Sequence, residues 1–208
     1  NLILRLHKDE APVLQEYAPH ILHAIPRLTA RQHLGRGTAL PFYGVDLWHA
    51  YEMSWLDNDG KPVVRVGRFT VPASSPYIVE SKSFKLYLNS LNSTRFATVE
   101  AARAIILKDI GGAVGDAIDL QLLRVGDPSL EGTTLIGECL DDVSVEYRSG
   151  QPKAGQLKVQ AGNMVEEMLY SHLLRSLCPV TGQPDWATVW LHYRGPAIER
   201  SSLLQYMI

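Results

Sequence analysis

The chain lacks the cysteine content and the charge imbalance that mark several common classes of protein. Its 208 residues include only two cysteines, Cys139 and Cys178, which are too few for a disulfide framework. Neither has a second cysteine or a histidine at zinc-ligand spacing, so no metal is expected. The formal net charge of −2 gives no reason to expect nucleic acid or a membrane as a partner. No apolar run is long enough to cross a bilayer, and we expect a cytoplasmic protein.

Three motifs of common enzymes are also missing. No Gly-x-Gly-x-x-Gly fingerprint follows a predicted strand, which argues against a Rossmann dinucleotide site. There is no phosphate-binding P-loop and no Gly-x-Ser-x-Gly nucleophile elbow. The composition, 46% hydrophobic and 20% charged, is ordinary for a globular protein. The length suits one large domain or two small ones.

The first half of the chain contains a predicted β-hairpin. Residues 45–55 alternate between apolar and polar side chains, and residues 63–71 form a second apolar run. Between them, the sequence Asp-Asn-Asp-Gly at residues 57–60 is a strong turn signal. The residues expected on one face of the first strand are Val45, Leu47, Tyr51, Met53 and Trp55.

Two predicted helices follow the hairpin. Residues 84–91 have apolar side chains at helical spacing, and residues 98–108 form a second helix expected to stop before Gly111-Gly112. Two further strands are expected at 117–125 and 137–147. The order of strand, strand, helix, helix, strand, strand predicts an α+β unit with helices on one face of an antiparallel sheet.

A second unit is predicted after a polar linker at 149–155. The segment 198–207 repeats the pattern of 79–88, because Glu, Ser and Tyr coincide and most apolar positions match. Each copy follows a predicted strand that ends in a proline-containing turn, at 194–196 in the second copy. The repeat favours an internal duplication. For residues 165–177 the pattern fits a helix and a strand equally well.

The segment 178–186 is the most informative for chemistry. Two prolines and a glycine in Cys-Pro-Val-Thr-Gly-Gln-Pro-Asp-Trp predict a rigid loop rather than a helix or strand. The thiolate of Cys178 is a potential nucleophile, and the carboxyl group of Asp185 could transfer protons beside it. The alternative is a small buried cysteine followed by an aspartate that caps a turn.

A second cluster lies at 80–87, Glu-Ser-Lys-Ser-Phe-Lys-Leu-Tyr, where a helix is expected to begin. A helix N-terminus with lysines favours anions such as phosphate, and Glu80 could accept N–H donors from a heterocycle. The alternative is that Ser81 or Ser83 caps the helix and the lysines face solvent.

Together the two clusters resemble the NADPH-dependent 7-cyano-7-deazaguanine reductases of the queuosine pathway. The family's signature is Glu-Ser-Lys-Ser, an apolar residue, Lys, an apolar residue and an aromatic, which stands here at 80–87. The segment 178–185 resembles the family's catalytic loop. The order of the motifs is that of the family's two-module form, and the resemblance extends from about Leu40 to the last residue.

The resemblance implies a fold and an assembly. The family belongs to the tunnelling-fold (T-fold) proteins, whose unit is an antiparallel sheet with two helices on one face. We therefore expect an α+β chain of tandem T-fold units that assembles as a homodimer. The expected divisions are an N-terminal arm at 1–40, a first module at 41–150 and the start of a second module at 156–208.

The resemblance also implies a reaction. NADPH would reduce the nitrile 7-cyano-7-deazaguanine (preQ0) to the amine 7-aminomethyl-7-deazaguanine (preQ1) in a four-electron process. Cys178 would attack the nitrile carbon to give a covalent thioimide, and Asp185 would protonate the nitrogen. The implied substrate contacts are Ile78, Val79 and Glu80, and the implied NADPH contacts are Ser81, Lys82 and Lys85.

One departure from the family pattern bears on activity. The family's second module continues to a His-Glu pair that holds substrate and to a segment with Arg and paired Gly that contacts NADPH. Both are expected after Ile208, so residues 1–208 alone are expected to bind substrate poorly. Two other hypotheses stay open: a T-fold purine- or pterin-binding protein without reductase activity, and a non-catalytic protein in which 178–186 is only a turn.

Overall fold

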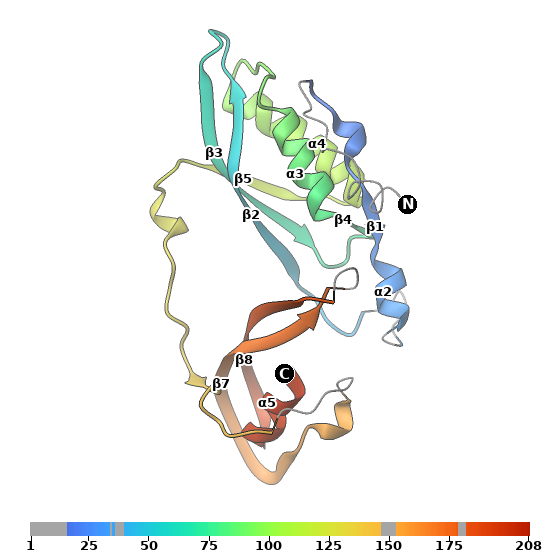
Figure 1. Cartoon of the computed structure of the whole chain (residues 1–208), viewed down its shortest axis with the longest axis vertical. Coiled ribbons are helices and arrows are strands. Elements are labelled where there is room, and N and C mark those ends of the chain that lie inside the picture. Colours follow the sequence, from blue (N-terminus) through green and yellow to red (C-terminus); the bar gives the residue numbers. More distant parts are fainter. Residues whose placement is uncertain (1–15, 34, 36–39, 147–152, 179–181) are drawn as a thin grey trace. The chain divides into compact units, whose positions relative to one another are not determined.

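The computed structural model of the chain describes residues 16–33, 35, 40–146, 153–178 and 182–208. The chain is α+β and divides into two compact units, an N-terminal unit, Asn1–Glu131, and a C-terminal unit, Gly132–Ile208 (Figure 1). Residues 1–15 of the predicted arm and residues 149–152 of the predicted linker lie outside the described residues. Among the described residues no helix is long and apolar enough to span a membrane.

The N-terminal unit contains the predicted hairpin. Strands β2 (Val45–Leu56) and β3 (Pro62–Pro72) pair antiparallel, and β5 (Asp119–Leu123) pairs with β3 on its other side. The turn at 57–60 is stabilised by the Asp57 carboxylate, which accepts backbone N–H groups of Asp59 at 3.0 Å and Lys61 at 2.9 Å. The hairpin prediction is therefore confirmed.

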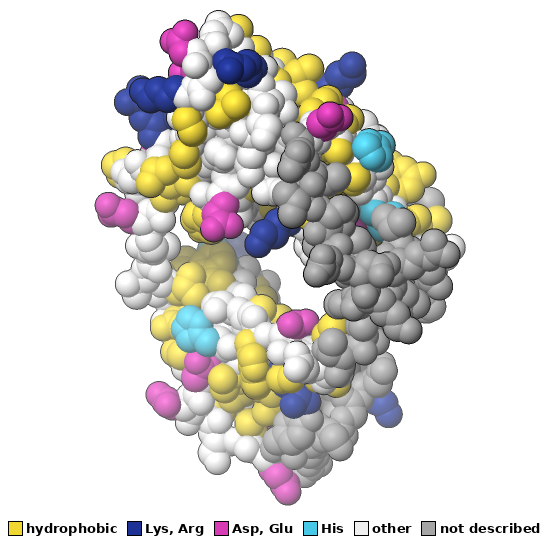
Figure 2. Space-filling view, turned by 45° about the horizontal axis from the view of Figure 1, so that its top comes forward, with side chains coloured by type: hydrophobic (Ala, Val, Ile, Leu, Met, Phe, Trp, Pro, Cys, Tyr) yellow, Lys and Arg dark blue, Asp and Glu magenta, His cyan; other side chains and the backbone are white. Residues whose placement is uncertain are grey.

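The predicted alternation along β2 is wrong for its first half. The register of β2 against β3 shifts between Ala50 and Met53, which is a β-bulge. The extra residue reverses which side chains face the helices. Met53, after the bulge, is 1% exposed, whereas Leu47, before it, is 54% exposed and Tyr51, within it, is 63% exposed. Figure 2 shows such hydrophobic side chains in yellow at the surface.

Two helices complete the core of the N-terminal unit. They are α3 (Ser81–Ser90) and α4 (Val99–Val114). One cluster of buried side chains joins them to the sheet, with Phe69 and Leu120 from the strands and Tyr87 and Ile106 from the helices. The predicted stop before Gly111 is wrong. The helix continues to Gly115, whose φ of +73° provides the left-handed C-cap.

An N-terminal segment crosses this unit. The short strand β1 (Ala24–Pro26) pairs antiparallel with β4 (Tyr77–Val79), the strand that leads into α3. The helix α2 (Arg27–His33) follows, and its first side chain forms an ion pair with Asp46 on β2. The single-turn 3-10 helices are η1 (Pro19–Ile21), η2 (Pro128–Leu130) and η3 (Ala154–Gln156).

In its described residues, the C-terminal unit is mainly a long hairpin with an α-helix packed on it. Strands β7 (Val159–Leu177) and β8 (Pro184–Ile198) pair antiparallel, and α5 (Arg200–Met207) packs on one face through Leu203 and Met207. The ambiguous segment 165–177 is therefore strand. The predicted turn at 194–196 is wrong, because β8 is an edge strand and an edge tolerates a proline without a backbone N–H.

The predicted strand at 137–147 is much shorter than expected. Within the described part of this range, 137–146, only β6 (Glu138–Cys139) is formed, and it pairs parallel with β7 rather than with the sheet of the N-terminal unit. Gly137 allows this approach, because its φ is +130° and a Cβ there would lie 2.5 Å from the Met168 carbonyl oxygen. The next residue in the core, Leu140, is fully buried.

Candidate active site

The signature segment begins α3, and its glutamate caps the helix. The Glu80 carboxylate accepts the backbone N–H groups of Lys82 at 2.8 Å and Ser83 at 2.7 Å. This satisfies two of the N–H groups that a helix start leaves without partners. The expectation of a serine cap at Ser81 or Ser83 is therefore wrong, since the glutamate side chain reaches the same groups.

A group of hydrogen bonds, which we call the anchor knot, ties this helix start to the N-terminal segment. The knot consists of His23, Glu80 and Ser83. The Glu80 N–H donates to the His23 carbonyl at 2.8 Å, and the His23 N–H donates to the Ser83 hydroxyl oxygen at 3.1 Å. That hydroxyl donates to the Glu80 carbonyl at 2.8 Å. The knot fixes the position of α3 against β1.

The C-terminal unit contains a second anchor knot, formed by Lys158, Glu199 and Ser202. The Glu199 N–H donates to the Lys158 carbonyl at 2.9 Å, and the Lys158 N–H donates to the Ser202 hydroxyl oxygen at 3.1 Å. The Ser202 hydroxyl donates to the Glu199 carbonyl at 2.9 Å. The sequence repeat thus corresponds to repeated hydrogen bonding. The Glu199 carboxylate differs from that of Glu80 because it makes no cap and instead accepts from the Ser201 hydroxyl.

A groove of about 830 Å³ runs between α3 and the edge strand β2. Ser81 and Lys85, both implied NADPH contacts, line it, whereas the third, Lys82, is half-buried and does not. The other lining side chains include aromatic rings on β2 and polar groups on α3 and just after it: Trp48, His49, Tyr51, Asn89 and Asn92. The groove is large enough for an extended ligand and has a cationic side chain at one wall.

The implied substrate contacts before the helix lie in β4. Val79 is buried in the core of the N-terminal unit, and Ile78 is half-buried beside a small apolar cavity. Val79 therefore packs its side chain inward. Glu80 is half-buried, and its two backbone hydrogen bonds leave part of the carboxylate's acceptor capacity for a ligand, because a carboxylate has about four acceptor positions.

The cysteine segment closes the β7–β8 hairpin of the C-terminal unit. Cys178 donates its N–H to the Gln183 carbonyl at 2.9 Å, and its own carbonyl accepts the Gly182 N–H at 2.9 Å. Gly182 has φ +68°, which the turn requires. Residues 179–181 lie outside the described residues. The predicted loop is therefore shorter than expected, because Asp185 already belongs to β8.

The register places the two implied catalytic residues on one face of this hairpin. Asp185 lies opposite Ser176, which is two residues before Cys178. Alternate residues of a strand face the same side, and diagonal neighbours across a hairpin lie roughly 7 Å apart. Cys178, whose side chain is partly exposed, and Asp185 are thus diagonal neighbours on the same side.

Known proteins resemble the chain closely. Residues 14–122 match the family model described as nitrile reductase, 7-cyano-7-deazaguanine-reductase N-term. The NADPH-dependent 7-cyano-7-deazaguanine reductase of Chromohalobacter salexigens is 49% identical over 200 residues, which are 96% of this chain and 72% of that protein. The enzyme of the same name from Stenotrophomonas maltophilia is 51% identical over 195 residues, 93% of this chain and 70% of that protein. The chain belongs to this family of nitrile reductases.

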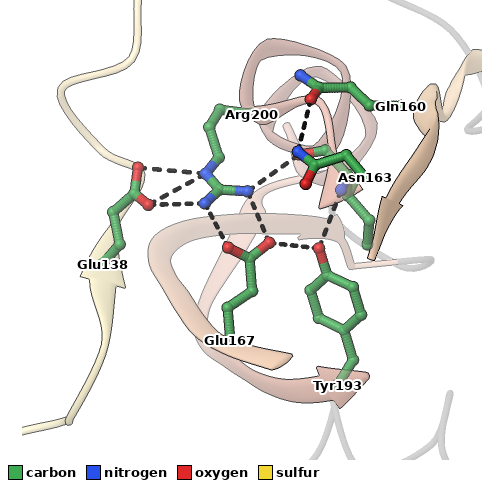
Figure 3. A network of polar contacts seen from close by, with 7 residues as sticks. Glu138, Gln160, Asn163, Glu167, Tyr193 and Arg200 are labelled. Atoms are coloured by element: carbon green, nitrogen blue, oxygen red, sulfur yellow. Dashed lines mark hydrogen bonds and ion pairs between the residues drawn. The ribbon is translucent and has the colours of Figure 1, made fainter. Parts of the chain in front are cut away.

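Sequence reasoning missed a charged network in the C-terminal unit of this reductase (Figure 3). The Arg200 guanidinium donates to Glu138 on β6 at 2.8 Å and to Glu167 on β7 at 2.7 Å. The hydroxyl of Tyr193 on β8 also donates to Glu167 and accepts the Ile198 N–H at 2.9 Å. Hydrogen bonds from Arg200 and then Tyr193 lower the pKa of Glu167. The network joins three strands to α5, and no local sequence pattern signals these partners.

Proposed function

We propose that the chain reduces the nitrile of 7-cyano-7-deazaguanine (preQ0) to the primary amine (preQ1) with NADPH, in queuosine biosynthesis. The observation that carries this proposal is the identity of about half of all residues to two reductases of that name, over nearly the whole chain. The groove beside α3 and the hairpin with Cys178 and Asp185 support it chemically.

Cys178 is the proposed nucleophile. Its sulfur adds to the nitrile carbon, one C–N π bond breaks, and the product is a thioimide in which the sulfur is bonded to that carbon. Covalent addition divides a difficult reduction into easier steps. The thioimide retains every atom of the substrate, so the enzyme should gain the full substrate mass.

Asp185 is the proposed proton donor. When the thiolate adds, negative charge develops on the nitrile nitrogen, and a carboxylic acid within reach can transfer a proton to it. The placement of Asp185 as a diagonal neighbour of Cys178 supports this role, because the nitrogen is one bond from the carbon that the sulfur attacks. After the first hydride has been added, the carbon–sulfur bond breaks and Cys178 is released as the thiolate.

The groove beside α3 is the proposed NADPH site. Its volume of about 830 Å³ is within the range of about 300–1,000 Å³ typical of small-molecule sites. Ser81 can donate to phosphate oxygens, and the Lys85 ammonium adds positive charge at the same wall. Lys82, which does not line the groove, is proposed to contact the cofactor as well. NADPH supplies one hydride at each of the two reduction steps.

Glu80 is the proposed recognition group for the deazaguanine ring. Guanine-like heterocycles present adjacent N–H donors along one edge, which a carboxylate can accept together. Because the anchor knot and the helix cap hold Glu80, its remaining acceptor positions have a fixed direction. Ile78 and Val79 are proposed to border the ring from β4.

We also propose that the chain consists of tandem T-fold units and acts as a homodimer. The support for tandem units is the anchor knot, which occurs once in each unit with similar hydrogen-bond distances. The homodimer is proposed from the resemblance to the family alone. Size-exclusion chromatography with light scattering tests the assembly, and a monomer at micromolar concentration would contradict it.

Intact-mass spectrometry tests the chemistry. The protein is incubated without NADPH, together with Cys178→Ala and the matched control Cys139→Ala. The nitrile 7-cyano-7-deazaguanine is in large excess, so that weak substrate binding does not prevent the adduct. We expect an adduct of the full substrate mass in the unaltered chain and in Cys139→Ala, and none in Cys178→Ala. An adduct that persists in Cys178→Ala would disprove the assignment of the nucleophile.

A second measurement tests the reduction. NADPH consumption is followed by absorbance with the nitrile limiting, and we expect two NADPH oxidised for each nitrile consumed. The Chromohalobacter salexigens enzyme serves as positive control. Binding of the deazapurine without adduct or NADPH oxidation, under conditions where the control turns over, would favour a purine-binding protein instead.

A further inference from the structure

A carboxylate on α4 joins the signature helix to the N-terminal segment. Tyr87, the last residue of the signature, is fully buried, and its hydroxyl donates to Asp109 Oδ2 at 2.7 Å. The hydroxyl of Tyr17 donates to the same oxygen at 2.5 Å. The two tyrosine rings also meet edge to face, with centroids 6.5 Å apart. One oxygen atom therefore holds two segments that are 70 residues apart in the sequence.

The N-terminal segment then follows α3 toward its start. The Ala18 N–H donates to the Ser90 hydroxyl oxygen at 3.2 Å, and that hydroxyl donates to the Tyr87 carbonyl at 2.6 Å. Five residues further along, His23 enters the anchor knot at the helix start. Residues 17–23 are thus attached at both ends of α3, and we call them the brace.

We infer that Asp109 and Tyr17 are positioning residues for the NADPH groove, which act through the brace and Tyr87. This inference rests on the proposed function of the groove. Ser81 and Lys85 project from α3, whereas the opposite wall of the groove belongs to β2. A small rotation or slide of α3 changes the spacing between the two walls. The brace and Asp109 resist that movement, although neither Asp109 nor Tyr17 lines the groove.

The hydroxyl groups are better targets than the rings, because the rings contribute to packing. Tyr17→Phe and Tyr87→Phe each remove one hydrogen bond to Asp109 and keep the ring. Tyr17 is 38% exposed, so the first variant should fold normally. Tyr43→Phe is the matched control, because Tyr43 is fully exposed in the same unit.

The experiment measures NADPH binding by quenching of tryptophan fluorescence, since Trp48 lines the groove. In parallel it measures the rate of Cys178 adduct formation without NADPH at saturating nitrile, where a change in substrate affinity at Glu80 does not affect the rate. We expect Tyr17→Phe and Tyr87→Phe to weaken NADPH binding about threefold to tenfold, the range for one lost hydrogen bond. We expect the adduct rate to stay unchanged in both variants, and Tyr43→Phe to behave as the unaltered chain.

Three outcomes would overturn the inference. The first is unchanged NADPH binding in both brace variants. The second is an equal loss in adduct rate and in NADPH binding, because that would indicate general destabilisation. The third is no NADPH binding by the unaltered chain. The proposed function fails separately, if the unaltered chain forms no adduct. In that case the comparison of NADPH dissociation constants still decides whether the brace positions the groove.

Discussion

Replacing Glu80 by glutamine separates its role as a cap from its proposed role as a ligand. A glutamine side chain offers one acceptor oxygen and one NH₂ group, so only one of the two backbone N–H groups of Lys82 and Ser83 keeps its partner. Loss of a helix cap costs about 0.5–2 kcal/mol. A substrate N–H bonded to a charged acceptor contributes about 1.5–3 kcal/mol, and one bonded to a neutral acceptor about 0.5–1.5 kcal/mol. The lost charge should therefore weaken substrate binding by about 1–1.5 kcal/mol, which corresponds to roughly 5-fold to 13-fold in affinity.

The repeat supplies a matched control. Glu199 occupies the same place in the second anchor knot, but its carboxylate caps no backbone group. Glu199→Gln should therefore leave amide exchange at the start of α5 unchanged, whereas Glu80→Gln should speed exchange at Lys82 and Ser83 by roughly 2-fold to 30-fold.

Two assays read the two effects. Hydrogen–deuterium exchange followed by mass spectrometry reports the cap, and the substrate dependence of adduct formation reports the ligand contact. If Glu80→Gln loosens the helix start but leaves substrate affinity unchanged, Glu80 is only a cap. If both variants behave alike in both assays, the distinction drawn between the two copies is wrong.

The remaining expectations concern the C-terminal unit. Asp185→Asn should slow adduct formation by about 100-fold or more, because an amide cannot act as the acid; an unchanged rate in rapid-quench mass spectrometry would exclude Asp185 as donor. Gly137→Ala should lower the free energy of unfolding in urea by about 2–5 kcal/mol, since its Cβ would meet a backbone oxygen at 2.5 Å. Gly132→Ala, with nothing within 4 Å, should be neutral. Arg200 lowers the pKa of Glu167, so this unit should lose stability as pH falls below the ordinary value of 4.5. Arg200→Met should reduce this loss of stability at low pH.

Local patterns predicted the elements that depend on local chemistry. The turn at 57–60 and the start of α4 at Thr98 follow from side chains that bond their own neighbouring backbone. The alternation along β2 failed because a bulge depends on how two strands pair, which a single strand does not encode. The strand expected at 137–147 failed for a similar reason, since β6 forms only where β7 is present to pair with it.

Some residues of the candidate site were likewise predicted from the sequence, and others were missed. Spacing and resemblance pointed to Ser81 and Lys85, and both line the groove. The glutamate cap was missed because serine is the commoner capping residue, although Glu80 stood in the right place. The shared oxygen of Asp109 was missed for another reason. Its partners Tyr17 and Tyr87 are 92 and 22 residues away, and such contacts leave no periodic signal.

The anchor knot has a consequence for how the sequence can vary. At positions 23 and 158 the knot uses only the backbone N–H and carbonyl, so it is formed equally by a histidine and a lysine. Its side-chain requirement is confined to the serine three residues after the glutamate. The first helical residue takes no part in the hydrogen bonds of either knot. That position can therefore differ between the two copies, with Ser81 lining the groove and Arg200 in the charged network, while the hydrogen bonds of the knot stay the same.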